Sequence, residues 1–399
     1  MLRSQFLRHI AQTSEAPLAL EVERAEGLYL YDPQGKAYMD LIAGIGVSSL
    51  GHRHPRVLEA VKEQIDRYWH TMVYGEYLLA PQIRLAELLA KQLPPGLSCA
   101  YFVNSGTEAT EGAMKLAKRF TGRREIVACK NAYHGSTQGA ASLMAPTTFT
   151  QAYFPLLPGI RHIEFNSVED LDLITAQTAC VIVETVQAEC GIRKPEGDYL
   201  RHLRARCDQT GALLVFDEIQ AAFGRTGTLF AFEQYGIAPD ILLLAKGMGG
   251  GMPIGAFIAS QEIMQTLSHN PPLGHLSTFG GHPVSCAAAL ATLQVLLDEP
   301  WIGQVRQKES LFRSLLQHRS IIELRSAGLW LAVELPDFAF VDAVVRSCLK
   351  KGLILDWFLF NERSIRIAPP LIISEDQIRW ACATLVETME EVSAGRGDF

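Results

Sequence analysis

The 399-residue sequence lacks the features of several large classes of protein. No uninterrupted apolar run approaches the roughly 20 residues of a transmembrane helix, so we expect no membrane span. The N-terminal segment is too polar for a secretory signal peptide, which favours a cytoplasmic location. Lys and Arg are spread without a basic block and the net charge is −7, so nucleic acid is not an expected partner.

Cysteines are few and never spaced as C-x-x-C: there are eight, several of them in apolar runs such as IVAC, which ends at Cys129. Such cysteines are typical of reduced core thiols in a reducing compartment. His52 and His54 in GHRHP have no carboxylate cluster beside them, so we predict no metal site. The motifs of P-loop nucleotide enzymes, zincin proteases and nucleophile-elbow esterases are also missing, which disfavours these activities.

What the sequence does contain is typical of a globular enzyme. Apolar residues make up 48% and charged residues 20% of the chain, and the length favours one large domain with a smaller partner. Residues 18–41 alternate apolar with polar around an Asp-Pro-Gln-Gly turn, which predicts a short antiparallel meander.

Short apolar runs separated by helical patterns follow from about residue 55. Runs of this kind are typical of strands buried on both faces by crossover helices, and they predict an α/β fold with a mostly parallel sheet. After a helix near 283–298, strands alternate with helices to the end, as in a smaller α+β domain. We expect a small domain built from residues 1–50 and 296–399 around a large domain at 51–295. The predicted strands of the large domain are AYFVN at 100–104, EIVAC at 125–129, CVIVE at 180–184, ALLVFDE at 212–218, ILLLA at 241–245 and GAFIA at 255–259.

Three segments at strand ends carry candidate chemistry. Ser105, Gly106 and Thr107 follow the first predicted strand and open a helix, where free N–H groups suit a phosphate; a capping box with Glu108 is the alternative and is more common. Asp217 and Glu218 end another strand, at the sheet edge where ligands bind in α/β folds; an N-cap or a loop salt bridge is equally compatible.

The third segment is Lys246, which follows ILLLA directly and precedes a glycine run. Burial lowers the pKa of a lysine and favours Schiff-base chemistry, and the glycines let a ligand approach the backbone. A dinucleotide fingerprint is rejected because Met252 occupies the position of its third glycine. A further carboxylate pair, Glu184 and Glu189, lies at and after the strand CVIVE.

Together these segments resemble the class III pyridoxal-phosphate aminotransferases, which include ornithine, acetylornithine and 4-aminobutyrate aminotransferases. The resemblance implies fold type I: a large domain with a seven-stranded sheet, a small domain from both chain ends, and a homodimer with shared active sites. The matching stretches, in order, are DLIAGIGVSSLGHRHP, FVNSGTEATEGAMKLAKR, AYHGST, VIVETVQAECG, LLVFDEIQAAFGRTG, APDILLLAKGMGGGMPIGA, STFGGHPVSCAAALA and RIAPPL.

The resemblance also implies roles for individual residues. Lys246 would bind pyridoxal 5'-phosphate (PLP) covalently and move the proton during transamination, and Asp217 would pair with the pyridine nitrogen. Thr278 would contact the phosphate of the neighbouring subunit's cofactor. The remaining cofactor-binding residues would be Ser105, Gly106, Thr107, Tyr133, His134, Glu184 and Gln220.

Substrate recognition would depend on Arg366, which matches an arginine that binds an α-carboxylate, and on Glu189, which pairs with that arginine in the ornithine branch. Ser136 replaces a usual arginine and Ile45 a usual tyrosine, which disfavours N-acetylornithine, 4-aminobutyrate and ornithine as donors. We therefore predict an aminotransferase that acts on an ω-amine or diamine-derived donor and on 2-oxoglutarate. The alternatives are a glutamate-1-semialdehyde aminomutase-like enzyme, an N-acetylornithine aminotransferase and, least favoured, a non-catalytic cofactor-binding or regulatory protein.

Overall fold

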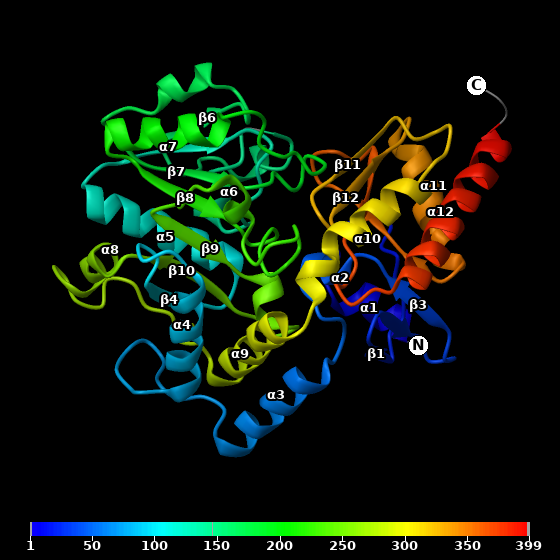
Figure 1. Ribbon diagram of the computed structural model, residues 1–399, viewed down its shortest axis with the longest axis horizontal. Helices are drawn as coiled ribbons and strands as arrows, with labels where there is room; N and C mark the ends of the chain where they lie inside the picture. Colours follow the sequence, from blue (N-terminus) through cyan, green and yellow to red (C-terminus); the bar gives the residue numbers. More distant parts are fainter. Residues whose placement is uncertain (1, 146, 397–399) are drawn as a thin grey trace.

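A seven-stranded sheet organises the left half of the molecule as drawn in Figure 1, in a computed structural model that describes residues 2–145 and 147–396. The strand order is β4-β10-β9-β8-β7-β5-β6, and β10 alone runs antiparallel to its two neighbours. The strands are β4 (Cys99–Val103), β5 (Glu125–Cys129), β6 (Ile160–Ile163), β7 (Thr178–Glu184), β8 (Leu213–Asp217), β9 (Ile241–Leu244) and β10 (Gly255–Ala259).

The apolar runs of the sequence form the centre of this sheet, and every residue of β7, β8, β9 and β10 is buried. Neighbouring side chains of β5 enter separate cores: Val127 packs on one face, and Ile126 and Ala128 on the other. The predicted mostly parallel sheet is confirmed. The edge strand β6 escaped the sequence analysis because its residues, Ile-Arg-His-Ile, include two polar side chains and only one fully buried position.

Helices cover both faces of the sheet (Figure 1), and α5 packs against β9 and β10 while α3 and α4 pack on α9. The helices of this part are α3 (Pro55–Arg67), α4 (Ala80–Gln92), α5 (Gly106–Thr121), α6 (Gln138–Ala141), α7 (Tyr199–Thr210), α8 (Gln261–Gln265) and α9 (Pro283–Asp298). Short 3-10 helices are η1 (Gln151–Tyr153), η2 (Glu169–Leu173), η3 (Ala231–Tyr235), η4 (Lys246–Gly249) and η5 (Thr266–Ser268).

The N-terminal and C-terminal segments of the chain share the other half of the molecule (Figure 1). The predicted N-terminal meander is present, and its last strand, β3, pairs in parallel with β13 from the C-terminal region. A second sheet has the order β11-β12-β15-β14. The elements are α1 (Leu2–His9), β1 (Arg24–Glu26), β2 (Tyr29–Tyr31), β3 (Ala37–Asp40), α2 (Ala43–Gly46), α10 (Trp301–Leu315), β11 (Glu323–Ser326), β12 (Leu331–Glu334), α11 (Phe338–Lys350), β13 (Leu353–Ile354), β14 (Asp356–Trp357), β15 (Ser364–Ile367) and α12 (Glu375–Arg396).

The domain limits at residues 50 and 295 stay a prediction, although the pairing of β3 with β13 joins the two ends of the chain as that prediction requires. None of the helices in the described part of the chain is both long and apolar enough to cross a membrane.

We predict that Gly112→Ala destabilises the protein by about 1–3 kcal/mol, because a methyl group there would overpack a filled core. The new Cβ would lie 2.2 Å from the ring of Phe257, which is fully buried and stacks on Tyr101. Urea unfolding measures the change. The control is Gly303→Ala in α10, where no atom lies within 4 Å and alanine stabilises a helix by up to about 1 kcal/mol. Equal effects of the two substitutions would contradict the packing argument.

Candidate active site

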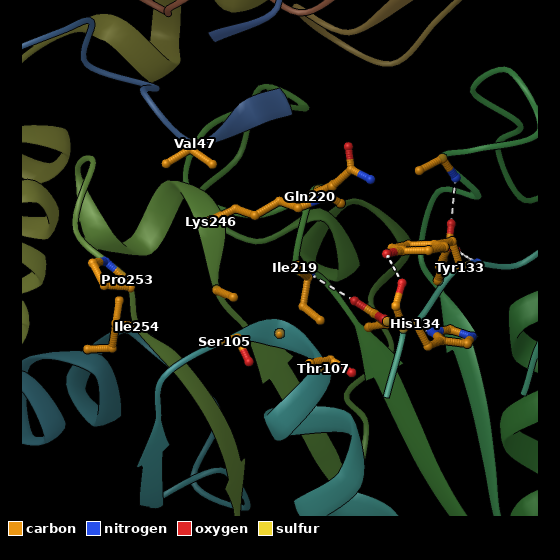
Figure 2. A pocket seen from close by; sticks show the side chains of 18 of the residues that line it. Val47, Ser105, Thr107, Tyr133, His134, Ile219, Gln220, Lys246, Pro253 and Ile254 are labelled. Atoms are coloured by element: carbon orange, nitrogen blue, oxygen red, sulfur yellow. Dashed lines mark hydrogen bonds and ion pairs between the residues drawn. The ribbon is translucent and has the colours of Figure 1, made fainter. Parts of the chain in front are cut away.

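A cavity of about 480 Å3 lies at the edge of the sheet where β4, β7, β8 and β9 end. These four strands run in one direction, so the polar residues that follow them converge (Figure 2). The cavity is lined by nine of the predicted site residues: Ser105, Gly106, Thr107, Tyr133, His134, Glu184, Asp217, Gln220 and Lys246.

One end of the cavity is the first turn of α5. Ser105 caps this helix, and its hydroxyl accepts a hydrogen bond from the Glu108 N–H at 3.3 Å, as the capping alternative requires. The N–H groups of Gly106 and Thr107 have no acceptor within the helix because they belong to its first turn. Gly106 leaves room for Ile219, whose Cδ1 atom would lie 2.8 Å from a Cβ at this position. Capping and anion binding are therefore compatible at this helix start.

A buried acid–base pair forms the floor of the site. The His134 Nδ1 and Asp217 Oδ2 atoms are 2.7 Å apart, and the Ile219 N–H donates to Asp217 Oδ1 at 2.9 Å. Burial opposes a charge on the imidazole, but the hydrogen bond and charge of Asp217 outweigh it and raise the pKa of His134. His134 and the Ile219 N–H together hold both carboxyl oxygens of Asp217 in place. The pair therefore presents a buried carboxylate to the cavity.

Glu184 ends β7 directly beside Asp217, with which it is paired in the sheet register. It accepts hydrogen bonds from the N–H groups of Tyr133 and Ala188, and so fixes the two loops that border the cavity. Burial raises the pKa of Glu184 to about 7. The Tyr133 hydroxyl lies 2.9 Å from the hydroxyl of Ser136, the residue that replaces the arginine expected at this position.

Lys246 begins a 3-10 turn after β9 and has a backbone φ of 45°, in the left-handed region that non-glycine residues rarely occupy. Such conformations are costly and cluster at functional sites. Burial lowers the pKa of Lys246 to about 8. The side chain therefore reaches its neutral, nucleophilic form much more readily than an exposed lysine does.

A second ion pair lies behind Gln220. The Arg366 Nη2 atom donates to Glu189 Oε2 at 2.8 Å, and Gln220 donates to the other oxygen, Oε1, at 3.2 Å. Arg366 comes from β15 and Glu189 from the loop after β7, so the pair joins the two halves of the molecule. Burial opposes ionisation of Glu189, but the charge of Arg366 outweighs it and lowers the pKa of the carboxyl.

Four predicted residues are not part of the cavity lining: Glu189 and Arg366, which form the ion pair beside it, and Thr278 and Ile45. Thr278 is exposed in the segment between η5 and α9. Ile45 is 40% exposed and has a φ of 65°, two residues before the lining residue Val47. Sequence reasoning missed other lining residues because they are apolar and carry no motif signal of their own: Val47, Val186, Ile219, Met252, Ile254 and Trp330.

No group of three or more potential metal ligands was found among the described residues. The cavity is instead organised by an amine, a buried carboxylate and a helix start. These are the groups expected for PLP.

Comparison with known proteins decides the family. Residues 10–389 match the family Aminotransferase class-III. The chain belongs to the class III aminotransferases. It is similar to an acetylornithine aminotransferase of Methanocaldococcus jannaschii (38% identity, 94% of each chain) and to a putrescine aminotransferase of Pectobacterium atrosepticum (39% identity, 91% of this chain and 80% of the relative).

Solved structures agree with this family. The ornithine aminotransferase of Toxoplasma gondii has a TM-score of 0.92 at 28% identity over 99% of this chain and 96% of its own. The predicted fold type I architecture is therefore confirmed. Class III aminotransferases use PLP, so this chain is a PLP-dependent transaminase.

The lowered pKa of Lys246 predicts how the stability of the cofactor-free protein depends on pH. Below pH 8 the amine is protonated in both states, and its burial destabilises the fold in full. Between pH 8 and 10.5 the folded state loses the proton first, so stability rises with pH. Lys246→Met should remove this contribution and stabilise the protein at pH 7 by on the order of 1–3 kcal/mol.

Urea unfolding of the cofactor-free protein at several pH values measures this effect. The control is Lys62→Met, because Lys62 is exposed on α3 and its replacement should leave the pH profile unchanged. Identical pH profiles for the parent protein and Lys246→Met would show that burial does not shift the lysine.

Proposed function

We propose that this aminotransferase transfers an amino group from an ω-amine or diamine-type donor to 2-oxoglutarate. The observation that carries the proposal is the buried ion pair of Arg366 and Glu189, 2.8 Å apart beside the cavity. The Arg366 guanidinium can bind the carboxylate of one substrate. It can instead pair with Glu189 when the other substrate brings no carboxylate. Ser136, in place of the usual arginine, lines the cavity and supports a donor without a carboxylate near this position.

The residues present fit PLP. We propose that the first-turn N–H groups of Gly106 and Thr107, with Ser105, hold its phosphate, because a helix N-terminus stabilises an anion. Asp217, held by His134, is suited to a protonated pyridine nitrogen. When bound, PLP supplies an electron sink for the substrate carbon that loses its proton.

Further residues of the cavity lining suit the aromatic ring of PLP and its phenolic oxygen. Tyr133 and Ile219 both line the cavity and offer surfaces against which an aromatic ring can pack. Gln220 offers an amide within the same lining, which suits a phenolic oxygen.

Lys246 is proposed as both the covalent anchor and the proton carrier. With a pKa of about 8 the amine is mostly protonated at pH 7, but its neutral fraction is far larger than that of an exposed lysine, as Schiff-base formation and general base catalysis require. The positive φ fixes the start of the side chain at the cavity wall. The same amine accepts the proton from the substrate carbon and later returns it.

We propose that Arg366 and Glu189 let one cavity accept both the carboxylate substrate and the ω-amine donor. The carboxylate of glutamate or 2-oxoglutarate binds the Arg366 guanidinium, a planar donor that suits a carboxylate. When the ω-amine donor occupies the cavity, Glu189 neutralises the guanidinium, since an unpaired buried charge is costly.

We further propose a homodimer in which Thr278 serves the cofactor of the partner subunit. Thr278 is exposed and lies next to Phe279, which is 53% exposed. An exposed aromatic residue beside a predicted cofactor contact supports burial of this segment by a second copy.

A cytoplasmic location is also proposed. The eight cysteines are free thiols, and all except Cys99 are buried. Free cysteines in these positions are typical of a reducing compartment.

A donor screen tests the proposed function. Putrescine and other ω-amines, N-acetylornithine, ornithine and 4-aminobutyrate are each supplied with 2-oxoglutarate, and glutamate formation is measured. We expect the diamine-type donors to be used best and Lys246→Ala to form no glutamate with any donor. Preference for N-acetylornithine would instead support the function named for several relatives of this chain. Isomerisation of glutamate-1-semialdehyde without any 2-oxo acid would favour the aminomutase alternative.

Single-turnover measurements of the two half-reactions test this role of Arg366 and Glu189. Arg366→Ala should weaken the binding of glutamate and 2-oxoglutarate by about 3–5 kcal/mol, since the Glu189 charge is then left unpaired. Glu189→Ala should slow the ω-amine half-reaction while leaving glutamate binding unchanged or tighter. Equal losses in both half-reactions for both variants would mean that the pair only maintains the structure.

A further inference from the structure

Arg366 faces a second carboxylate, that of Asp356, besides Glu189. Asp356 lies on β14 directly opposite Arg366 in the antiparallel pairing with β15. Its Oδ1 atom is 3.4 Å from the Arg366 Nε atom, which makes an ion pair without a hydrogen bond. The guanidinium is therefore placed between two acids from two different segments of the chain.

Three polar atoms of the Arg366–Asp356 pair are buried and have no hydrogen-bond partner. This holds for Nε and Nη1 of Arg366 and for Oδ1 of Asp356. Buried polar groups of this kind are rare in folded proteins, because each costs free energy when it is left unpaired. A small shift of the guanidinium toward Asp356 would pair two of the three atoms.

Glu189 is held more firmly than Arg366 is. Its Oε2 accepts from the Leu359 N–H at 3.0 Å as well as from Arg366, and its Oε1 accepts from Gln220. Arg366 is held at Nη2 alone, by Glu189 and the Trp357 carbonyl. Of the two partners, the guanidinium is the one with free donors and an alternative acceptor.

We propose that Asp356 is a positioning residue that receives the Arg366 guanidinium when a substrate carboxylate displaces it from Glu189. In this arrangement Glu189 stays in place on the Leu359 N–H, and Arg366 moves along the face of Phe358, whose ring centroid is 4.7 Å away. The guanidinium keeps a counter-ion in both positions. The inference rests on the proposed function, in which Arg366 binds the substrate carboxylate.

The charges around Asp356 suit this exchange. Burial raises the pKa of Asp356 to about 7, Arg366 opposes this shift, and the acids Glu189 and Asp40 reinforce it. Asp40 accepts from the N–H groups of Ile42 and Ala43 and pairs with His52, and as a hydrogen-bond acceptor it offers Asp356 no stabilising contact. Among these charged neighbours, only the Arg366 guanidinium stabilises the negative charge of Asp356.

Asp356→Asn in the full-length holoenzyme tests the proposal, because it removes the charge and keeps the shape. We expect the apparent Kd of glutamate in the single-turnover half-reaction to rise about tenfold, since Arg366 then stays with Glu189. The ω-amine half-reaction, in which Arg366 does not move, should change by less than about twofold, a difference of under 0.5 kcal/mol. Asp356→Glu, which restores the charge, should recover much of the affinity.

The Glu189→Ala background makes the test specific. In this background Arg366 has no ion pair with Glu189 to break. Adding Asp356→Asn should therefore change the glutamate affinity little, and the effects of Glu189→Ala and Asp356→Asn should not be additive. The matched control is Asp342→Asn, an acid on α11 that pairs with Arg346 and should leave both half-reactions unchanged. Asp356→Ser serves the same comparison if Asp356→Asn does not yield folded protein.

The other outcomes overturn the proposal. Tighter glutamate binding by Asp356→Asn in both backgrounds would show that Asp356 merely competes with the substrate. Equal losses in both half-reactions, or no change in either, would show that Asp356 has no part in moving Arg366. Unaltered glutamate binding by Arg366→Ala would instead refute the proposed role of Arg366 itself, so the two failures are distinguishable.

Discussion

The site depends on one buried hydrogen-bonded pair, Asp217 and His134, at the edge of the large sheet. Asp217 ends a fully buried strand, where a polar side chain requires a hydrogen-bond partner. His134 supplies this partner from a loop that Glu184 holds through the Tyr133 N–H. One buried pair thus determines where the loop after β5 must lie, and with it where Tyr133 and Ser136 enter the cavity.

A second buried pair connects this edge to the rest of the chain. Arg366 and Glu189 lie far apart in sequence, and their contact links β15 of the C-terminal sheet to the loop after β7. The same C-terminal region pairs with the N-terminal meander through β13. The proposed substrate-recognition pair is therefore coupled to the placement of one half of the molecule against the other, and a shift between the halves would reach Arg366 directly.

Much of the cavity could be predicted from the sequence because its polar residues follow buried strands. Asp217 and Lys246 each come at or just after an apolar run, and Ser105 follows another, so their meeting at one edge follows from the direction of the strands. The apolar lining could not be predicted in this way. Ile219 and Trp330 look like ordinary core residues, and only the folded chain turns them toward a cavity.

The sequence by itself determined every strand of the large sheet except β6, the N-terminal meander and the family, because hydrophobic periodicity and motif order are local properties. Tertiary structure alone decided which charges meet. The contact of Asp356 with Arg366 depends on the register of β14 against β15, and that of His134 with Asp217 on the path of a loop. Such contacts join residues that are distant in the chain or are set by strand register, so no local pattern encodes them; they arise only when the core closes and brings these polar side chains together.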